Sequence, residues 1–210
     1  MFKMKRKFKV LLTRRLHDFA LTKLRERCEI TIHSGKIPMP KQKILEEIKD
    51  KDGLICFPYD IIDQEILDST NKLKTISTFS VGFDHIDINC AKKKRITIGY
   101  TPDVLTNATA ELTIGLILDL LRRITEGDHI IRKGKWNEIF GPFDYVGTEI
   151  SGKTLGILGM GRIGKTVAKK ASCLGMNILY HNKKSIVKTG KAKYVSLNEL
   201  FKKSDVVSIH

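Results

Sequence analysis

The chain has 210 residues, of which 41% are hydrophobic and 29% charged, a balance that supports a packed core and argues against wholesale disorder. It carries 38 Lys and Arg against 23 Asp and Glu, a net charge of +15, which would suit nucleic acid, an anionic membrane surface or anionic small molecules. The lysines are scattered over the whole sequence, however, and RNA-binding signatures and zinc-finger spacings are absent. We therefore expect no nucleic-acid partner.

The cysteines and the apolar runs indicate a cytoplasmic protein. None of Cys28, Cys56, Cys90 and Cys173 forms a CxxC pair, which is usual in a reducing compartment. The basic and then apolar N-terminus lacks the length and the cleavage site of a signal peptide. The longest apolar run, residues 112–121, contains a charge and is too short to span a bilayer. We expect no membrane contact.

The first half of the sequence alternates short β-rich runs with helical patterns. Strands are predicted at residues 7–12, 29–33, 53–57, 72–78 and 95–100, and helices at 18–26, 41–51, 63–69 and 85–94. Strands separated by helical crossovers indicate βαβ units and a parallel sheet. Residues 1–99 are therefore predicted to form one α/β domain, which is compatible with a flavodoxin-like topology.

The second half, residues 100–210, begins with a different kind of helix. The segment at about 106–124 can be capped by Thr106 or Asn107, and it is apolar nearly all round between Leu112 and Leu121. We expect this hinge helix between the domains to be buried on all sides. A long turn-rich loop is expected at 127–151.

A second α/β domain is predicted after this loop. Its strands are expected at residues 153–158, 177–181, 193–195 and 206–210, and its helices at 162–175 and 196–204. Ser196 and Glu199 have the spacing of a capping box. The predicted fold class is thus α/β, with two doubly wound parallel sheets.

The turn between the first strand and the first helix of this domain has the spacing GxGxxG. Gly159 permits the tight turn, Gly161 lets the backbone approach a pyrophosphate, and Gly164 lets the helix pack closely on the strand. The free N–H groups of the helix start attract the anion. Because the motif follows an apolar strand and opens a helix, it predicts a dinucleotide site; the alternative is that the glycines serve packing alone.

The end of the second strand indicates which dinucleotide binds. An NAD site places a carboxylate there for the ribose hydroxyls, whereas this sequence has Asn182, Lys183 and Lys184. The missing acid removes the repulsion of a 2′-phosphate and the lysines supply positive charge. We therefore predict NADP as the preferred cofactor, with NAD as the alternative if these lysines are ordinary solvated turn residues.

Four stretches in this order give the chain a resemblance to a known family: "TISTFSVGFDHIDI", "ITIGYTPDVLTNATAELTIGLILDLLRR", "GKWNEIFGPFDYVGTEISGKTLGILGMGRIG" and "ILYHNKKS". The chain resembles the D-isomer-specific 2-hydroxyacid dehydrogenases, and within them the glyoxylate/hydroxypyruvate reductases. The resemblance implies a flavodoxin-like substrate domain and an NAD(P)-binding Rossmann domain that is incomplete here.

The resemblance also implies roles for matching residues. The backbone N–H groups of Val81 and Gly82 would hold the substrate carboxylate, and a turn at the carboxyl edge of a sheet suits that role; the alternative is a plain strand-ending turn. Trp136 would lie on an arm that reaches a second subunit of a homodimer, although a lone Trp is more often core. Other positions would line the cofactor: Leu105, Thr109, Met160, Gly161, Arg162 and Ile163, the first two of which could be only packing residues.

No catalytic residue is assigned to this chain. In the family an Arg fixes the substrate, a His acts as general acid and a Glu tunes that His, and the resemblance places all three beyond His210. His210 itself matches a cofactor-side His at the end of a strand. His85, next to the carboxylate turn, is expected to be a surface or turn residue.

The resemblance therefore implies a chain that ends early. Val206, Val207 and Ile209 would leave an apolar face without a covering layer. We expect the 210-residue chain alone to be inactive and poorly soluble or partly molten.

The implied reaction is the NAD(P)H-dependent reduction of a small 2-oxo acid, glyoxylate or hydroxypyruvate, to the D-2-hydroxy acid. Phosphoglycerate dehydrogenase and other D-2-hydroxyacid dehydrogenases are close alternatives. A different alternative is a dinucleotide-sensing binding module like the C-terminal-binding-protein corepressors, which share the fold.

Overall fold

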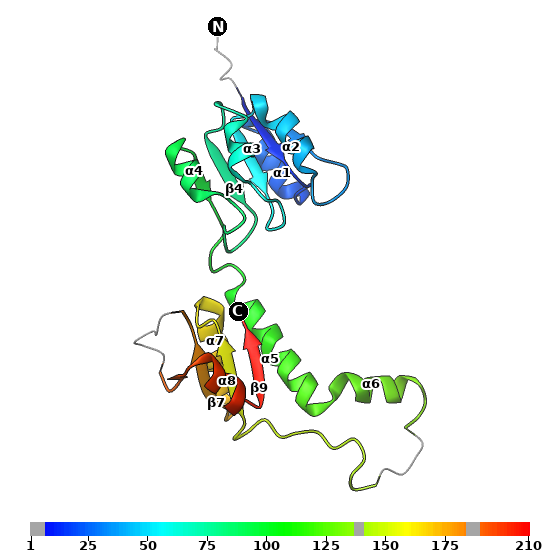
Figure 1. Ribbon diagram of the computed structural model, residues 1–210. Coiled ribbons are helices and arrows are strands. Elements are labelled where there is room, and N and C mark those ends of the chain that lie inside the picture. Colours follow the sequence, from blue (N-terminus) through cyan, green and yellow to red (C-terminus); the bar gives the residue numbers. More distant parts are fainter. Residues whose placement is uncertain (1–6, 137–140, 184–189) are drawn as a thin grey trace. The chain divides into compact units, whose positions relative to one another are not determined.

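The computed structural model describes residues 7–136, 141–183 and 190–210 (Figure 1). The chain divides into two compact units, Met1–Val104 and Leu105–His210, which we call unit 1 and unit 2 and describe separately. Each unit is built on one parallel sheet.

Unit 1 contains a five-stranded sheet in the order β2-β1-β3-β4-β5. All neighbouring strands are parallel, and the order is that of flavodoxin-like sheets, so the predicted topology is confirmed. The elements are β1 Phe8–Leu12, α1 Asp18–Arg25, β2 Cys28–Ile32, α2 Lys41–Glu47, η1 Ile48–Asp50, β3 Gly53–Cys56, α3 Gln64–Asp68, β4 Thr75–Thr78, α4 Ile88–Lys93 and β5 Thr97–Gly99.

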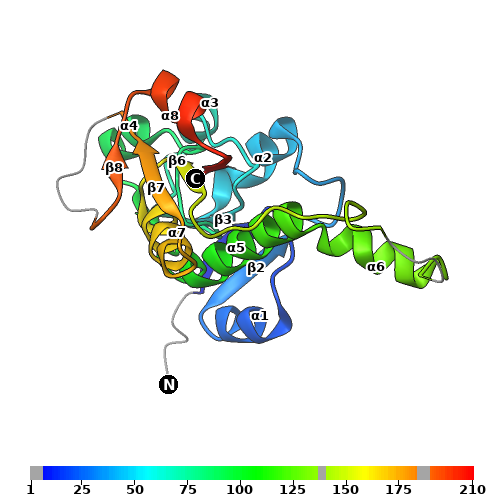
Figure 2. The same ribbon diagram turned by 90° about the horizontal axis from the view of Figure 1, so that it is seen from below.

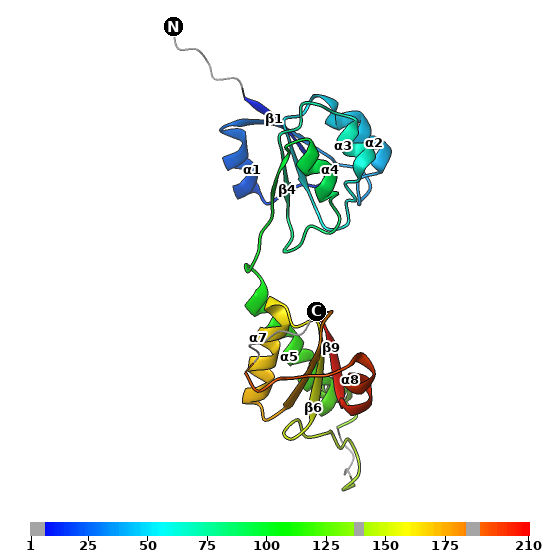
Figure 3. The same ribbon diagram turned by 60° about the vertical axis from the view of Figure 1, so that its left-hand side comes forward.

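Alternate residues of the strands of unit 1 face two helical layers, because successive side chains of a strand point to opposite faces. Leu11 lies in the main core with Ile44 of α2 and the buried residues of α3 and α4. Its neighbours Val10 and Leu12 pack against Leu21 of α1 in a second cluster. Figure 3 shows α1 on one side of the sheet and α2, α3 and α4 on the other.

Unit 2 contains a four-stranded parallel sheet in the order β8-β7-β6-β9. Counted along the chain this is third, second, first, fourth, which is the order at the start of the Rossmann sheet. The elements are α5 Thr106–Arg122, α6 Ile124–Arg132, β6 Thr154–Leu158, α7 Arg162–Cys173, β7 Asn177–His181, β8 Lys193–Tyr194, α8 Leu197–Lys203 and β9 Val206–Ile209.

Helices α5 and α7 cover one face of this sheet side by side (Figures 1 and 2). Ala110 and Ile117 of α5 share a core with Val167 and Ala171 of α7 and with the buried residues of β6 and β7. Helix α8 lies on the opposite face, where a Cβ at Gly156 would meet the Leu200 side chain at 2.9 Å. One half of the predicted capping box is present, since Ser196 Oγ accepts from the Glu199 N–H at 3.2 Å, while the Glu199 carboxylate accepts from Lys203 Nζ.

The prediction that the helix at 106–124 is buried on all sides is wrong within unit 2. Leu112, Leu116 and Leu120 of α5 are 63%, 59% and 70% exposed. These leucines are four residues apart and so lie along one face of the helix; we call them the α5 stripe. The N-cap is Leu105, without a side-chain cap, rather than Thr106 or Asn107.

The predicted loop at 127–151 is wrong in its first part, which belongs to α6. Arg123, in the left-handed region at φ 56°, separates α5 from α6. The Asp119 carboxylate then accepts from the N–H and the hydroxyl of Thr125, at 2.6 and 2.8 Å. These bonds satisfy backbone and side-chain donors at the new helix start, so the chain resumes a helix through Gly127.

Strand β9 has one covered and one open face within unit 2. Val206 is buried in the core of unit 2, whereas Val207 and Ile209, whose side chains point to the other face, are 36% and 72% exposed.

Candidate functional site

The glycine turn of unit 2 lies where the strand order reverses, between β6 and β9. Ligands of open α/β sheets bind in the crevice at the carboxyl ends of the strands at this point. Gly159 follows β6 with φ +102°, and a Cβ there would lie 2.1 Å from the His210 carbonyl oxygen. A Cβ at Gly164 would lie 2.2 Å from the Gly159 carbonyl oxygen. Both positions therefore require glycine for reasons of the fold alone.

Gly161 differs from its two neighbours in the motif. No described atom lies within 4 Å of the Cβ that a side chain would add there. Gly161 is the N-cap of α7, with φ −75° and ψ −157°, a conformation open to other residues. No steric contact with a described residue requires glycine here, whereas a ligand that approaches the backbone would.

The start of α7 suits an anion. Arg162 and Ile163 begin the helix, and the first turn contains no acidic residue. Free N–H groups and the helix dipole favour negative charge at such an end. The predicted pyrophosphate residues Gly159 to Gly164 thus form one turn, and its chemistry fits a dinucleotide phosphate.

Asn182 follows β7 and contacts the glycine turn directly. Its side-chain oxygen accepts a hydrogen bond from the Met160 N–H at 2.7 Å, and its backbone oxygen accepts from the Tyr194 hydroxyl at 3.4 Å. The residue at the expected acid position is therefore uncharged and fixed beside the turn. Lys183 is exposed, and Lys184 lies outside the described residues.

His210 follows β9 on the other side of the glycine turn. Its N–H donates to the Leu158 carbonyl at 2.9 Å, and its ring Nε2 lies 2.9 Å from Ser208 Oγ. Burial lowers the pKa of His210 below its ordinary value. A neutral imidazole in this place adds no charge to the turn at neutral pH.

Leu105 and Thr109, the other cofactor-side predictions, lie at the start of α5. Leu105 is 39% exposed and its carbonyl accepts from the Thr109 N–H at 2.9 Å. The start of α5 and the carboxyl end of β9 lie at the same end of unit 2 (Figures 1 and 3). Trp136, predicted on the dimer arm, follows α6 and is 57% exposed.

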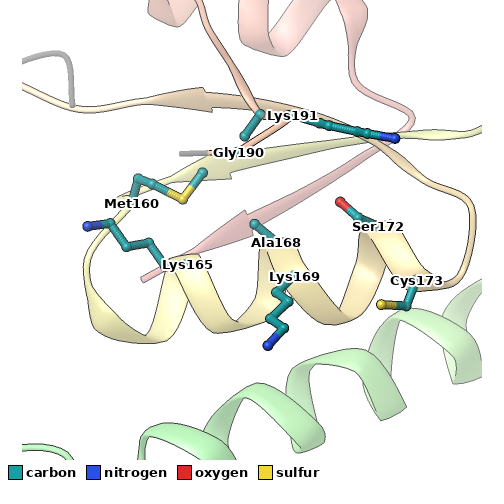
Figure 4. A pocket seen from close by; sticks show the side chains of 9 residues that line it. Met160, Lys165, Ala168, Lys169, Ser172, Cys173, Gly190 and Lys191 are labelled. Carbon is teal, nitrogen blue, oxygen red and sulfur yellow. The ribbon is translucent and has the colours of Figure 1, made fainter. Parts of the chain in front are cut away.

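A groove of about 420 Å³ runs along α7 beneath residues 190–192. Figure 4 shows Met160 and Lys165 at one end and Ser172 and Cys173 at the other. Only Met160 belongs to the glycine turn, so this groove extends along the helix away from the predicted pyrophosphate residues.

The carboxylate turn of unit 1, residues 80–85, follows β4 at the carboxyl edge of the sheet. Val81 and Gly82 are half-buried, and within the described parts of the chain neither N–H has a hydrogen-bond acceptor. Among the atoms of the described residues, a Cβ at Gly82 would meet only Asp84 Oδ2, at 3.7 Å. Unsatisfied backbone donors at the carboxyl edge of a sheet are suited to an anion.

A buried carboxylate links the strands at the reversal point of this sheet, between β1 and β3. Asp60 is 2% exposed; it accepts from the Thr13 hydroxyl and from the Phe57 N–H at 2.8 Å. Its second oxygen, Oδ1, is buried without a partner among the described residues. Asp60 therefore belongs to the interior of this edge rather than to its surface. Leaving a carboxylate oxygen buried without a hydrogen-bond partner lowers the stability of the fold.

His85 lies in the turn, as expected, but it is not a surface residue. It is half-buried, and its Nε2 lies 2.8 Å from the hydroxyl of the buried Thr78. Burial lowers the pKa of His85, while the negative charges of Asp60 and Asp84 oppose the shift. The imidazole is therefore neutral at neutral pH.

Sequence reasoning missed Asp60, Thr13, Thr78 and Ser80. The available signal was their position, because each follows or ends a strand at the same edge of the sheet. The described residues hold no cluster of three metal-ligating side chains, and none of the described helices has the length and apolarity to cross a bilayer.

Comparison with known proteins agrees with this geometry. Residues 114–210 match the family model of the D-isomer specific 2-hydroxyacid dehydrogenase, NAD binding domain. The glyoxylate reductase of Thermofilum pendens is 44% identical over 207 residues, which are 96% of this chain and 61% of that protein. The glyoxylate reductase of Korarchaeum cryptofilum is 37% identical over 205 residues, 96% of this chain and 62% of that protein.

A solved structure shares both units. The TT0316 protein of Thermus thermophilus superposes with a TM-score of 0.84 and is 42% identical, covering 96% of this chain and 64% of that chain. This chain thus spans less than two thirds of the length of these relatives. The similarity runs through both the carboxylate turn and the glycine turn; residues 114–210 belong to the D-isomer-specific 2-hydroxyacid dehydrogenase family by their NAD binding domain, and nearly the whole chain is similar to its members.

Proposed function

We propose that this chain serves the NADPH-dependent reduction of a small 2-oxo acid, glyoxylate or hydroxypyruvate, to the D-2-hydroxy acid. The observation that carries the proposal is the presence in one chain of two anion-binding turns of different kinds. One has a glycine at a helix start with space beside it for a ligand, and the other has two backbone N–H groups at a sheet edge that lack an acceptor among the described residues. Two relatives named glyoxylate reductase support the substrate class.

The residues of unit 2 would hold the dinucleotide. The backbone at Gly161, Arg162 and Ile163 binds the pyrophosphate at the start of α7, and Met160, whose N–H is bonded to Asn182, lines it. Asn182, uncharged and bonded to Met160, leaves room for a 2′-phosphate without repelling it. Lys183 and Lys184 supply the opposite charge. The bound nicotinamide supplies the hydride for the 2-oxo carbon, and Leu105, Thr109 and His210 line its side of the site.

The residues of unit 1 would hold the substrate. Val81 and Gly82 donate their N–H groups to the substrate carboxylate, which orients the 2-oxo carbon. We assign neither the general acid nor the Arg and Glu of the family mechanism to a residue of this chain. Units 1 and 2 therefore correspond to a substrate domain and a cofactor domain.

The proposal is tested by binding first and by turnover second. We expect the chain to bind NADPH more tightly than NADH in isothermal titration, because the charge of the adenosine site is positive. In a protein in which this chain is joined to a segment that carries the general acid, loss of NADPH absorbance should depend on glyoxylate or hydroxypyruvate, and only weakly on phosphohydroxypyruvate. No binding of either dinucleotide would overturn the proposal, and preference for phosphohydroxypyruvate would replace the reductase by a phosphoglycerate dehydrogenase.

We also propose that the active form is a homodimer that buries the α5 stripe. Three leucines exposed along one helix face form an apolar strip of the kind that protein interfaces bury. Leu116→Glu should then lower the sedimentation coefficient to that of a monomer. The matched change Leu197→Glu, at an exposed leucine of α8, should not. A wild-type chain that sediments as a monomer at all concentrations would contradict the dimer.

A further inference from the structure

A chain of side-chain hydrogen bonds runs along the inner side of the carboxylate turn. The Ser80 hydroxyl donates to the Gly82 carbonyl oxygen. The Ser80 oxygen lies 3.1 Å from Thr78 Oγ1, and Thr78 Oγ1 lies 2.8 Å from His85 Nε2. Three side chains therefore connect the end of β4 to the backbone of the turn.

The number of hydrogens available fixes which group is the donor in each of these hydrogen bonds. A hydroxyl has one hydrogen to donate, and Ser80 uses its hydrogen for Gly82. Thr78 must then donate to Ser80, which uses the single hydrogen of Thr78. The ring of His85 is thus the donor to Thr78, and its hydrogen lies on Nε2.

The neighbouring thiol does not compete for the Thr78 hydrogen. Cys56 is buried beside Thr78, and burial raises the pKa of its thiol to about 12. The sulfur is therefore protonated, and a protonated thiol is a weak acceptor. The hydroxyl of Ser80 is the stronger acceptor, so the direction from His85 to Gly82 holds.

The backbone of the turn is fixed at both ends as well. The Ser80 carbonyl accepts from the N–H and from the hydroxyl of Thr101, each at 2.9 Å. The His85 carbonyl accepts from the Ile62 N–H at 2.8 Å. With both ends of the turn held, only the peptide groups between Ser80 and His85 can still change their orientation. The bond from the Ser80 hydroxyl to the Gly82 carbonyl restricts part of that motion.

We infer that Thr78 and His85 are positioning residues that hold the free Val81 and Gly82 N–H groups ready for the substrate carboxylate. This inference rests on the proposed function, because it concerns the same turn. Neither residue touches the carboxylate; each acts through Ser80 and the Gly82 carbonyl. Preorganised donors bind an anion more tightly than donors that must be ordered on binding.

The first test concerns the direction of the hydrogen bonds and needs no ligand. Nitrogen NMR of the His85 ring in the full chain should show the Nε2–H form at neutral pH. The Nδ1–H form would overturn the inference, because Nε2 could not then donate to Thr78.

The second test concerns affinity. Thr78→Val keeps the shape of the buried side chain and removes its hydroxyl, whereas Thr78→Ser keeps the hydroxyl. Glyoxylate would be titrated while the amide signals of Val81 and Gly82 are followed by NMR. Thr78→Val should weaken binding about tenfold, which corresponds to one net hydrogen bond, and Thr78→Ser should restore most of it.

A second pair of variants, at His85, tests the same hydrogen bonds without changing the buried Thr78. His85→Gln retains an N–H donor at the place of Nε2 and should bind glyoxylate nearly as well as the wild type, whereas His85→Leu should not. Thr75→Val, at an exposed residue at the other end of β4, is the control and should change nothing.

The outcomes separate the inference from the function beneath it. Equal glyoxylate affinity in the wild type, Thr78→Val and His85→Leu would overturn the positioning role. Wild-type Val81 and Gly82 signals that do not respond to glyoxylate, with the ring of His85 in the Nε2–H form, would overturn the carboxylate site itself and leave the hydrogen-bond chain as a fact of the fold.

Discussion

The glycine turn of unit 2 and the carboxylate turn of unit 1 both lie at the carboxyl edge of a parallel sheet, but different forces hold them. In the glycine turn the backbone is packed so closely that a Cβ at Gly159 or Gly164 would meet a carbonyl oxygen at 2.1 or 2.2 Å. In the carboxylate turn, a Cβ at Gly82 would have one atom of the described residues within 4 Å, at 3.7 Å. There the backbone is held by hydrogen bonds of the Thr78, Ser80 and His85 side chains.

The reversal points of the two sheets show the same contrast. Between β6 and β9, Gly159 contacts the His210 backbone directly. Between β1 and β3, the Asp60 carboxylate joins the Thr13 hydroxyl and the Phe57 N–H. A turn held by backbone contact tolerates almost no added atom, whereas a turn held by side chains tolerates an added methyl but depends on each polar partner.

The largest expected effect comes from Gly164→Ala. Its new methyl would collide with the Gly159 carbonyl oxygen, which is backbone and cannot rotate away. Overpacking of this kind costs about 3 kcal/mol. Hydrogen exchange of the β6 and α7 amides should accelerate accordingly, while the amides of unit 1 should keep their rates. Unchanged exchange in β6 would show that backbone crowding does not hold this turn.

Gly161→Ala should separate packing from binding within the same motif. The methyl would meet no described atom within 4 Å, so the free energy of unfolding should fall only by the cost of alanine at an N-cap, about 0.5–1 kcal/mol. NADPH affinity, measured by isothermal titration, should fall about tenfold, equivalent to about 1.4 kcal/mol, because the methyl stands where the pyrophosphate meets the backbone. Equal affinity would favour the alternative that the three glycines serve packing alone.

Asn182→Asp should alter the cofactor preference without disturbing the turn. One aspartate oxygen can still accept from the Met160 N–H. The charge of the carboxylate repels a 2′-phosphate, and its second oxygen can accept from ribose hydroxyls. The ratio of NADPH to NADH affinity should therefore fall about tenfold, or about 1.4 kcal/mol. The control Asn198→Asp adds the same charge at an exposed position in α8 and should leave the ratio unchanged. A ratio that does not move in Asn182→Asp would remove the argument for NADP.

The contrast between the turns also explains what the sequence could predict. The GxGxxG spacing, the strand before it and the helix after it are local features, and the structure confirms the turn that they predict. Backbone crowding leaves a mark in the sequence, because only glycine satisfies it. The alternating strands and helices of unit 1 are also local features, and they predicted a parallel sheet because the period of each element follows directly from its geometry.

The hydrogen bonds among the side chains of unit 1 do not require a particular residue type or spacing that the sequence would show. Thr78, Ser80 and His85 belong to the end of a strand and to a turn, and no period relates them. Asp60 is a charged residue that the general preference for exposed carboxylates would place on the surface. Its burial becomes visible only when β1 and β3 are neighbours.

The error at α5 has a related cause. An apolar helix predicts that some partner will cover it, but the sequence does not name the partner. Within unit 2, α7 covers Ala110 and Ile117 and leaves the α5 stripe exposed. Helix α6 was missed because Gly127 weakens a helical pattern, while the Asp119 bonds that restart the helix join residues on both sides of the break.

The smallest expected effect, from Gly82→Ala, tests the comparison most directly. Gly82 is not in the left-handed region, and its added methyl would make one ordinary contact with Asp84. The free energy of unfolding should therefore change by less than about 0.5 kcal/mol, in contrast to Gly164→Ala. Glyoxylate affinity at the Val81 and Gly82 amides should fall only a few fold, because the Gly82 carbonyl still accepts from the Ser80 hydroxyl after the substitution. A loss of stability as large as that of Gly164→Ala would mean that backbone crowding holds both turns, and the hydrogen bonds from His85 to Gly82 would then follow the conformation of the turn rather than set it.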